Sequence, residues 1–272
     1  MGAAPNVREA RPQALAGRTI VVTRPAAQAR ALADGIVAAG GVPILFPALE
    51  IVDVADPAPM RAVAVRLDEF DLAIFISANA VEKALARISA QRAWPSTVKV
   101  ATVGKSSERA LARYGVSGVI APRERFDSEA LLELTPLSEP AVRGKRVVIF
   151  RGDGGRELLA EALAARGASV EYVECYRRRK PKLDPKPLLE LWAHDRLDAI
   201  TITSSEGLRN IWDMVGPGGR DRMIDTLLFA PHRRIAAQAH ALGLRRVILT
   251  EPGDQGLLAG LIARFAGESN RE

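Results

Sequence analysis

The amino-acid sequence repeats itself once, at a constant offset. Gly17–Arg24 recurs as Gly144–Arg151, which gives an offset of 127 residues (151 − 24). The same offset relates Asp71–Ser77 to Asp198–Ser204. Similarity at one fixed shift indicates two copies of one structural unit and not a solenoid of many repeats. Two similar units side by side would form a cleft, and ligands bind preferentially in clefts between units.

Hydrophobic periodicity predicts the fold class. Short apolar runs alternate with Ala/Leu-rich amphipathic stretches, a pattern typical of a parallel sheet wrapped by helices, so we predict an α/β protein. Pro25 is suited to a first helical position, and Gly40 and Gly167 are suited to the residue after a helix end. The predicted strands are 19–23, 42–46, 72–76, 99–103 and 118–121 in the first copy, and 146–150, 170–173, 199–203, 226–230 and 246–250 in the second.

Composition excludes several classes of function. Only 5% of the residues are aromatic, which argues against a base-stacking surface for nucleic acid. The single cysteine, Cys175, rules out an internal disulfide, and the three histidines lack metal-ligand spacing, so we expect no metal. No apolar run approaches the roughly 20 residues of a membrane span. Residues 1–16 lack the apolar core of a secretory signal, so we expect a disordered tail and a cytoplasmic protein.

A basic run lies between the two halves of the chain. The net charge is +6, and Arg177–Lys182 contributes much of it. The run could be a solvated linker, or it could provide a positive field that steers an anionic ligand. DNA binding is a third reading, which no recognition motif accompanies.

The ligand site of an open parallel sheet lies beyond the carboxyl ends of its strands. In the loops expected there, Ser77, Asp127, Ser204 and Asp254 are suited to cap helices, each contributing about 1 kcal/mol. As a set, these helix N-termini and nearby cations, Arg156 among them, would form a rim that binds carboxylates or phosphates. The candidate ligand-binding residues are Arg24, Ser77, Asn79, Gly104, Lys105, Ser128, Arg151, Ser204, Ser205, His232 and Arg233.

Other motifs for chemistry are weak. The glycine-rich segment Arg151–Arg156 matches neither a dinucleotide fingerprint nor a P-loop, and no serine lies in a G-x-S-x-G elbow. Tyr176 lies near the predicted crossing between the halves. It could be a half-buried packing residue, or its phenol, protonated at neutral pH, could donate a proton to a leaving hydroxyl.

Together these segments resemble the uroporphyrinogen-III synthase family from Gly17 to Phe265. The order and spacing of the pieces carry the resemblance, because each piece alone is weak. The segments are Val22–Pro25, Ser77–Val81, Ala101–Gly104, Phe126–Leu132, Arg151–Arg156, Tyr176 and Thr203–Leu208.

The resemblance implies two flavodoxin-like, doubly wound parallel-sheet domains joined by a two-stranded linker. Domain 1 would be discontinuous, with residues 17–47 and 179–266, domain 2 would be 54–172, and the linker strands would be 48–53 and 173–178. It also implies an enzyme without cofactors that takes hydroxymethylbilane, expels its hydroxyl, inverts the last ring and closes the macrocycle through a spiro intermediate. Tyr176 would be the catalytic residue that assists loss of the hydroxyl.

The physical reading of the loops agrees with this implication. Hydroxymethylbilane carries eight carboxylates, so its binder needs helix N-termini and cations. One loop departs from the family pattern, because Ala230–Arg233 stands where relatives carry a Gly-Pro-Thr-Thr turn, and His232 or Arg233 would have to substitute. Ser205 could likewise take the part of Ser204.

The expected partners are this polycarboxylate substrate and, transiently, hydroxymethylbilane synthase, with no nucleic acid and no membrane. We expect a monomer, because a cleft between domains of one chain needs no second subunit. The alternative function is a non-catalytic, two-lobed protein of the same fold that binds anions or regulates.

Overall fold

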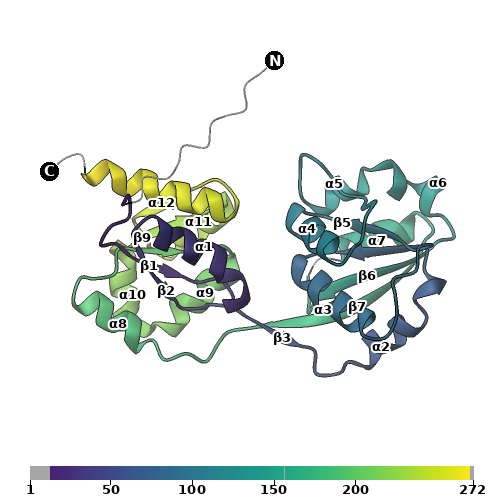
Figure 1. Cartoon of the computed structure of the whole chain (residues 1–272), viewed down its shortest axis with the longest axis horizontal. Helices are drawn as coiled ribbons and strands as arrows, with labels where there is room; N and C mark the ends of the chain where they lie inside the picture. The colour runs from purple at the N-terminus through teal and green to yellow at the C-terminus, as the bar shows by residue number, and fades with distance from the viewer. Residues whose placement is uncertain (1–12, 156, 270–272) are drawn as a thin grey trace, which may run out of the picture. The chain divides into compact units, whose positions relative to one another are not determined.

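The computed structural model describes residues 13–155 and 157–269, and it contains two compact units (Figure 1). Unit 1 takes the chain up to Glu50 and from Arg179 onward, and unit 2 takes Ile51–Arg178. The chain therefore leaves unit 1 within strand β3 (Glu50–Asp53) and returns within strand β7 (Ser169–Arg179), and these two strands are neighbours in one sheet. Among the helices of the described residues, none is long and apolar enough to cross a membrane.

Unit 1 is a five-stranded sheet with helices on both faces, as Figure 1 shows. Its strands are β1 (Thr19–Val22), β2 (Val42–Leu45), β8 (Ala199–Thr201), β9 (Leu227–Ala230) and β10 (Val247–Leu249). Its helices are α1 (Ala26–Ala38), α8 (Lys186–Ala193), α9 (Ser205–Met214), α10 (Gly216–Asp225), α11 (Arg233–Ala241) and α12 (Gly253–Ser269).

Unit 2 has a second five-stranded sheet. Besides β3 and β7, its strands are β4 (Leu72–Phe75), β5 (Lys99–Thr102) and β6 (Arg146–Gly152). Its α-helices are α2 (Ala58–Val65), α3 (Ala78–Ser89), α4 (Lys105–Arg113), α5 (Ser128–Leu132), α6 (Glu139–Val142) and α7 (Leu158–Ala165), and 3₁₀ turns lie at Leu67–Glu69 and Thr135–Leu137.

Four strands of each sheet share one topology, while the fifth lies beside β9 in unit 1 (β10) and beside β7 in unit 2 (β3). Each sheet is assembled from parts of both sequence repeats. The order in unit 1 is β2-β1-β8-β9-β10, and the order in unit 2 is β3-β7-β6-β4-β5. The repeat offset relates β1 to β6, β2 to β7, β8 to β4 and β9 to β5, so the run β2-β1-β8-β9 corresponds to β7-β6-β4-β5. This is the doubly wound, flavodoxin-like order. The fold-class prediction is confirmed. Unit 1 combines the beginning of the first repeat with the end of the second, and unit 2 combines the end of the first with the beginning of the second.

The cores follow from alternation along the strands. In β6, Val148 and Phe150 pack with α2, α3 and α4, whereas Val147 and Ile149 pack with α5, α6 and α7. Successive side chains of a strand point to opposite faces, so one buried run supplies two apolar layers. Unit 1 repeats this division, with α8–α11 on one face of its sheet and α1 and α12 on the other.

The duplication extends to individual hydrogen bonds at the amino edge of each sheet. Asp71, before β4, accepts from Lys145 Nζ at 2.8 Å and from the backbone N–H of Arg146 at 2.9 Å. At the offset of 127, Asp198 accepts from the Arg18 guanidinium at 2.9 Å and from the backbone N–H of Thr19 at 2.8 Å. Each aspartate thus aligns two neighbouring strands at their starting ends.

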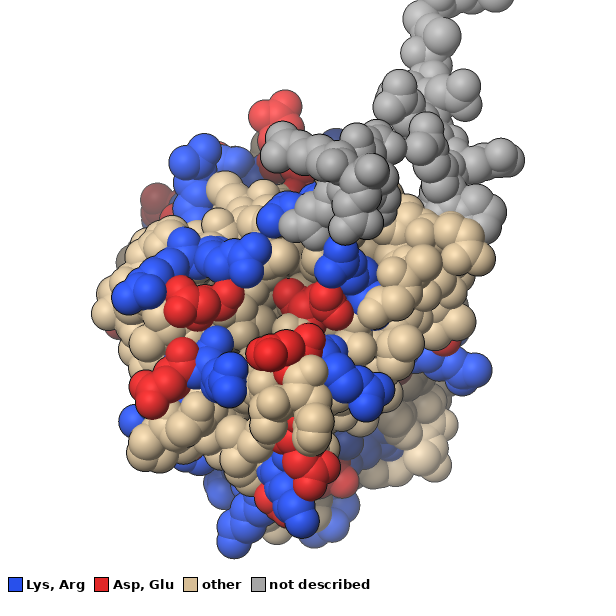
Figure 2. Space-filling model, turned by 90° about the vertical axis from the view of Figure 1, so that its left-hand side faces the viewer, with Lys and Arg blue, Asp and Glu red and all other residues tan. Residues whose placement is uncertain are grey.

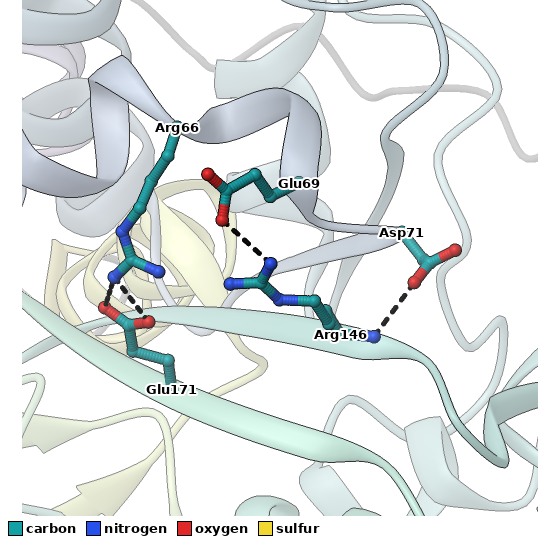
Figure 3. A network of polar contacts seen from close by, with 5 residues as sticks. All are labelled: Arg66, Glu69, Asp71, Arg146 and Glu171. Atoms are coloured by element: carbon teal, nitrogen blue, oxygen red, sulfur yellow. Dashed lines mark hydrogen bonds and ion pairs between the residues drawn. The ribbon is translucent and has the colours of Figure 1, made fainter.

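In unit 2 this edge continues into a network of ion pairs, shown in Figure 3. The Arg66 guanidinium contacts both carboxylate oxygens of Glu171, at 2.6 and 2.7 Å, and Arg146 Nη1 lies 2.8 Å from Glu69 Oε2. Both guanidinium carbons lie 5.4 Å from the centre of the Phe70 ring. Every acid in this network has a basic partner, so we assign the network to the stability of the sheet.

The structure corrects three local predictions. The predicted strand at 118–121 is a single bridge between Ile120 and Ala101, because Gly118 turns the chain with a φ of +66° just before it. Pro25 is the N-cap of α1 and not its first residue. Residues 1–12 of the predicted tail lie outside the described residues, but Leu15 is fully buried in the unit 1 core beside Ile36, so the ordered part of this unit begins before the predicted residue 17.

Charges of both signs are mixed on the surface. On the face that Figure 2 shows, blue and red side chains alternate without a large patch of one sign. The basic run behaves similarly, because Arg178 pairs with Asp153, and Arg179 and Lys180 pair with acids of unit 1. This face therefore lacks the continuous positive field that a nucleic-acid interface needs.

Candidate functional site

The structure places the predicted site residues at the carboxyl edges of the two sheets, in two groups. In unit 2, five of them follow the ends of β4 and β5 and lie at the start of a helix: Ser77, Asn79, Gly104, Lys105 and Ser128. Arg151 lies near the end of β6, and Tyr176 lies within β7 opposite Gly152. In unit 1 they follow β1, β8 and β9: Arg24, Ser204, Ser205, His232 and Arg233. Arg156 lies outside the described residues.

Two hydroxyl groups meet in unit 2. The phenolic oxygen of Tyr176, on β7, lies 3.0 Å from Ser77 Oγ, at the end of β4. Ser77 Oγ also accepts from the backbone N–H of Ala80 at 3.1 Å, which makes Ser77 the N-cap of α3. The pair lies at the switch point of the sheet, where strand order reverses between β6 and β4. Doubly wound sheets bind their ligands at this point.

An irregularity in β7 aims the tyrosine at this point. The β6–β7 register shifts between Arg151 and Gly152, so that Arg151 faces Glu174 and Gly152 faces Tyr176, with Cys175 as the extra residue. In a regular strand Cys175 and Tyr176 would point to opposite faces. Here both are buried in the same core, the one that includes α3. Bulges often redirect a side chain beside an active site.

Gly152 makes room for the phenol ring. A Cβ built on Gly152 would lie 2.6 Å from Tyr176 Cζ and 2.9 Å from its phenolic oxygen, which is too close for any carbon atom. Glycine is therefore the residue that permits the ring to lie against the end of β6. The glycine-rich character of this segment is visible in the sequence, but nothing in the local sequence signals the contact of Gly152 with β7.

The pair is specific to unit 2. Ser204 repeats the N-cap of Ser77, since its Oγ accepts from the backbone N–H of Gly207 at 2.9 Å. The residue that precedes Tyr176 by the offset of 127 is Leu49, which has no hydroxyl to offer. Ser205 is the first residue of α9, and its Oγ is buried without a hydrogen-bond partner among the described residues.

The predicted cations of the rim differ in their surroundings. Arg24 pairs with Asp254 at 2.9 Å, and Arg151, only 4% exposed, pairs with Glu157 at 2.9 Å. The Arg151 guanidinium holds the pKa of the Glu157 carboxyl below its usual value. Lys105 is exposed, with its Nζ 4.9 Å from the centre of the Phe126 ring.

The other predicted helix starts differ in detail. Asp127 caps α5 by accepting from the backbone N–H of Ala130 at 2.7 Å. The prediction that Asp254 caps a helix is wrong, because α12 already begins at Gly253. The Asp254 carboxylate faces Arg24. Gly104 caps α4 with backbone alone, and a Cβ there would meet nothing within 4 Å. Asn79 lies in the first turn of α3 and Ser128 begins α5.

His232 and Arg233, the candidates for the loop that departs from the family pattern, lie at the start of α11. His232 is its N-cap residue, without a side-chain capping bond, and both side chains are exposed. They are open to an anionic ligand, but no contact distinguishes one from the other.

Nucleophilic and metal chemistry find little support in the described residues. Burial raises the pKa of the Cys175 thiol to about 12, so this cysteine stays protonated and inert. Within the described ranges, no three His, Cys, Asp or Glu side chains lie close enough together to hold a metal ion. The site offers hydroxyls, guanidinium groups and helix N-termini.

Fold and site thus define a two-unit α/β protein with hydroxyl donors and cations at the carboxyl edges of its sheets. The family model described as "Uroporphyrinogen-III synthase HemD" matches residues 30–259. The chain is 33% identical over 244 residues to a uroporphyrinogen-III synthase from Salmonella typhimurium, covering 88% of this chain and 98% of that protein, and 31% identical to the one from Escherichia coli over the same shares.

A solved structure supports the same fold. The chain matches a mutant uroporphyrinogen III synthase from the extremely thermophilic bacterium Thermus thermophilus with a TM-score of 0.56 at 18% identity, over 94% of this chain and 100% of that one. The chain belongs to the uroporphyrinogen-III synthase family of hydro-lyases. The family and enzyme class expected from the sequence are confirmed.

Proposed function

We propose that this chain converts hydroxymethylbilane to uroporphyrinogen III, with loss of water and inversion of ring D, and that Tyr176 is its catalytic residue. One observation carries the proposal: the hydroxyl pair of Tyr176 and Ser77 at the switch point of unit 2, with 3.0 Å between its oxygens. Family membership supplies the reaction, and the pair supplies a proton donor at the edge where such sheets bind ligands.

The phenol would act as a general acid. It donates its proton to the hydroxymethyl oxygen of the substrate, the carbon–oxygen bond breaks, and water leaves as the pyrrole nitrogen supplies the electron pair. The resulting electrophilic carbon is attacked by ring D at the α-carbon that already carries the ring C methylene, which gives the spiro intermediate. The bond between that α-carbon and the ring C methylene then breaks and re-forms at the free α-carbon of ring D, which inverts the ring. Loss of the proton from that second α-carbon restores the pyrrole and returns a proton to the phenol, so protons balance over the cycle. Because Ser77 Oγ accepts from Ala80, its own proton is free to bond the phenolic oxygen and stabilise developing negative charge there.

The remaining predicted residues would bind the carboxylates of the substrate. Helix N-termini and guanidinium groups both favour anions, and α3, α4, α9 and α11 all begin at the carboxyl edges. We include as binding residues Arg24, Ser77, Asn79, Gly104, Lys105, Ser128, Arg151, Ser204, Ser205, His232 and Arg233. The enzyme would work as a cytoplasmic monomer that receives its unstable substrate from hydroxymethylbilane synthase, because uncaptured substrate closes spontaneously to the type I isomer.

Isomer analysis tests the proposal. The purified chain, supplied with hydroxymethylbilane as it forms, should yield the type III isomer, and a product that is type I alone would refute the proposed reaction. Tyr176→Phe keeps the ring in the core and removes only the donor, so we expect turnover to fall about 10²- to 10⁴-fold. Unchanged turnover in this variant would remove Tyr176 from the mechanism while leaving the reaction itself intact.

A further inference from the structure

The end of β6 presents different chemistry to the two faces of its sheet. Gly152 lies against Tyr176 on the face of the sheet that α3 covers. Arg151, two residues after Ile149, lies on the opposite face, which α7 covers. Arg151 is 4% exposed, its Cζ lies 4.5 Å from the centre of the Tyr172 ring, and its Nη1 donates to Glu157. Its Nε is buried and has no hydrogen-bond partner within the described part of the chain. A buried, charged donor without a partner is unfavourable unless a ligand completes it.

Arg151 borders a half-open cavity in unit 2 with a volume of about 260 Å³. Aliphatic and aromatic side chains form much of its wall, and Arg151, Ser128 and Asp127 supply the polar surface. The Asp127 carboxylate is engaged in capping α5, where it accepts from the backbone N–H of Ala130. An apolar wall with one buried cation suits a short carboxylate arm, whose methylenes contact the wall and whose charge faces the guanidinium.

The sequence repeat provides a comparison for this arginine. At the offset of 127, Arg24 and Asp254 in unit 1 correspond to Arg151 and Asp127 in unit 2. In unit 1 the aspartate pairs with Arg24 Nη2 at 2.9 Å, and Arg24 Nε has no hydrogen-bond partner among the described residues. In unit 2 the aspartate caps α5, and Arg151 pairs with Glu157 instead. Each arginine thus has one carboxylate partner and an unpartnered Nε, and in unit 2 that Nε belongs to a residue that lines the cavity.

We propose that the Arg151 cavity is a subsite for one carboxylate arm of the substrate. Identifying that arm with hydroxymethylbilane rests on the proposed function, whereas carboxylate binding itself does not. The incoming carboxylate accepts from Arg151 Nε, the donor of the guanidinium that Glu157 leaves unpaired. Glu157, 53% exposed, holds the other side of the guanidinium and competes with the ligand for it. Arg151 therefore selects substrates that carry a carboxylate at one fixed position.

The first test measures binding without turnover. Propionate is titrated into the full chain while the arginine Nε–H resonances are followed by NMR, with the exposed Arg143 as the reference within the same spectrum. We expect a saturable shift of the Arg151 signal with no shift at Arg143, and affinity up to about fivefold tighter in Glu157→Gln, because a competing ion pair is removed. No saturable shift, or an equal shift at Arg143, would overturn the subsite.

The second test links the subsite to the reaction. Arg151→Gln should raise the KM for hydroxymethylbilane at least about tenfold, and Arg151→Lys should raise it less, since a buried charge contact is lost or weakened. Arg143→Gln, which removes the same charge from a surface ion pair, should leave KM unchanged. Should Arg151→Gln fail to fold, the propionate titration of Glu157→Gln still decides. If the wild-type chain shows the propionate shift but a folded Arg151→Gln has an unchanged KM, the assignment of the subsite to the substrate is refuted. Type I product alone from the wild-type chain would refute only the proposed function.

Discussion

Gly152→Ala tests the geometry on which the proposed catalysis depends. The new methyl carbon would lie 2.6 Å from Tyr176 Cζ, 2.8 Å from Cε2 and 2.9 Å from the phenolic oxygen. Ordinary carbon contacts are about 3.5–4.0 Å, so the ring must retreat by about 1 Å. The ring is packed in the core against α3, so this overpacking should cost about 1–3 kcal/mol in the free energy of unfolding. A misplacement of about 1 Å can reduce turnover about 10²-fold.

The assay combines type III turnover with thermal denaturation, and the chain offers a matched control. Gly218→Ala is the same substitution in α10, at a position where a Cβ meets nothing within 4 Å, so it should leave turnover unchanged. In a Tyr176→Phe background, Gly152→Ala should cause little further loss of turnover, because both changes act through one hydroxyl. Full activity and an unchanged Tm in Gly152→Ala would refute this account of the site.

Three further predictions concern the surroundings of the site. Ser77→Ala should lose about 1 kcal/mol in the free energy of unfolding with the α3 cap, and should lower turnover less than Tyr176→Phe does; denaturant titration and turnover measure both. Hydrogen bonds from Lys145 and the Arg146 backbone hold the pKa of Asp71 below its usual value, so this carboxylate stabilises the fold above pH of about 3.9 and stops doing so as pH falls through the lowered pKa. Asp71→Asn should therefore destabilise the chain by less than about 1 kcal/mol at neutral pH and by nothing in strong acid, as paired denaturation curves would show. Cys175 should react with thiol reagents only after denaturation, because it is fully buried and its pKa is raised to about 12, and rapid labelling of the native chain would contradict this.

The fold was predictable because its signals are local and repeated. Nine of the ten strands predicted from apolar runs are present in the structure, and the offset of 127 indicated two related units. The exception, at 118–121, has the apolar residues of a strand, but a left-handed glycine leaves it only one bridge. The prediction that residues 1–16 form a disordered tail is wrong at Leu15, because a single buried leucine among polar residues and prolines gives no periodic pattern.

The site was predictable in its residue types but not in its geometry. Ser77 and Ser204 follow strand ends, and their capping role is a property of local sequence. The approach of Tyr176 to Ser77 depends on a bulge of one residue, which contradicts the period-two alternation that sequence analysis assumes. The same limit applies to Arg24, because an ion pair with Asp254 joins two ends of the chain that no local pattern connects.

The exchange of half-repeats explains how two similar units come to differ. In each sheet the switch point joins the first strand of one repeat to the third strand of the other, so the residues that meet there derive from different copies. Substitutions in one copy therefore change one unit only. Leu49 in place of a tyrosine removes the hydroxyl pair from unit 1, while Asp254 closes onto Arg24 there. Unit 2 keeps the phenol, and its arginine pairs with Glu157 and not with the aspartate. The phenol of Tyr176, from β7, lies against Gly152 at the end of β6, and the neighbouring Arg151 of β6 lines the proposed carboxylate subsite. A substrate arm held by Arg151 would then fix the rest of the molecule relative to Tyr176, which is the positioning that a ring closure of this kind requires.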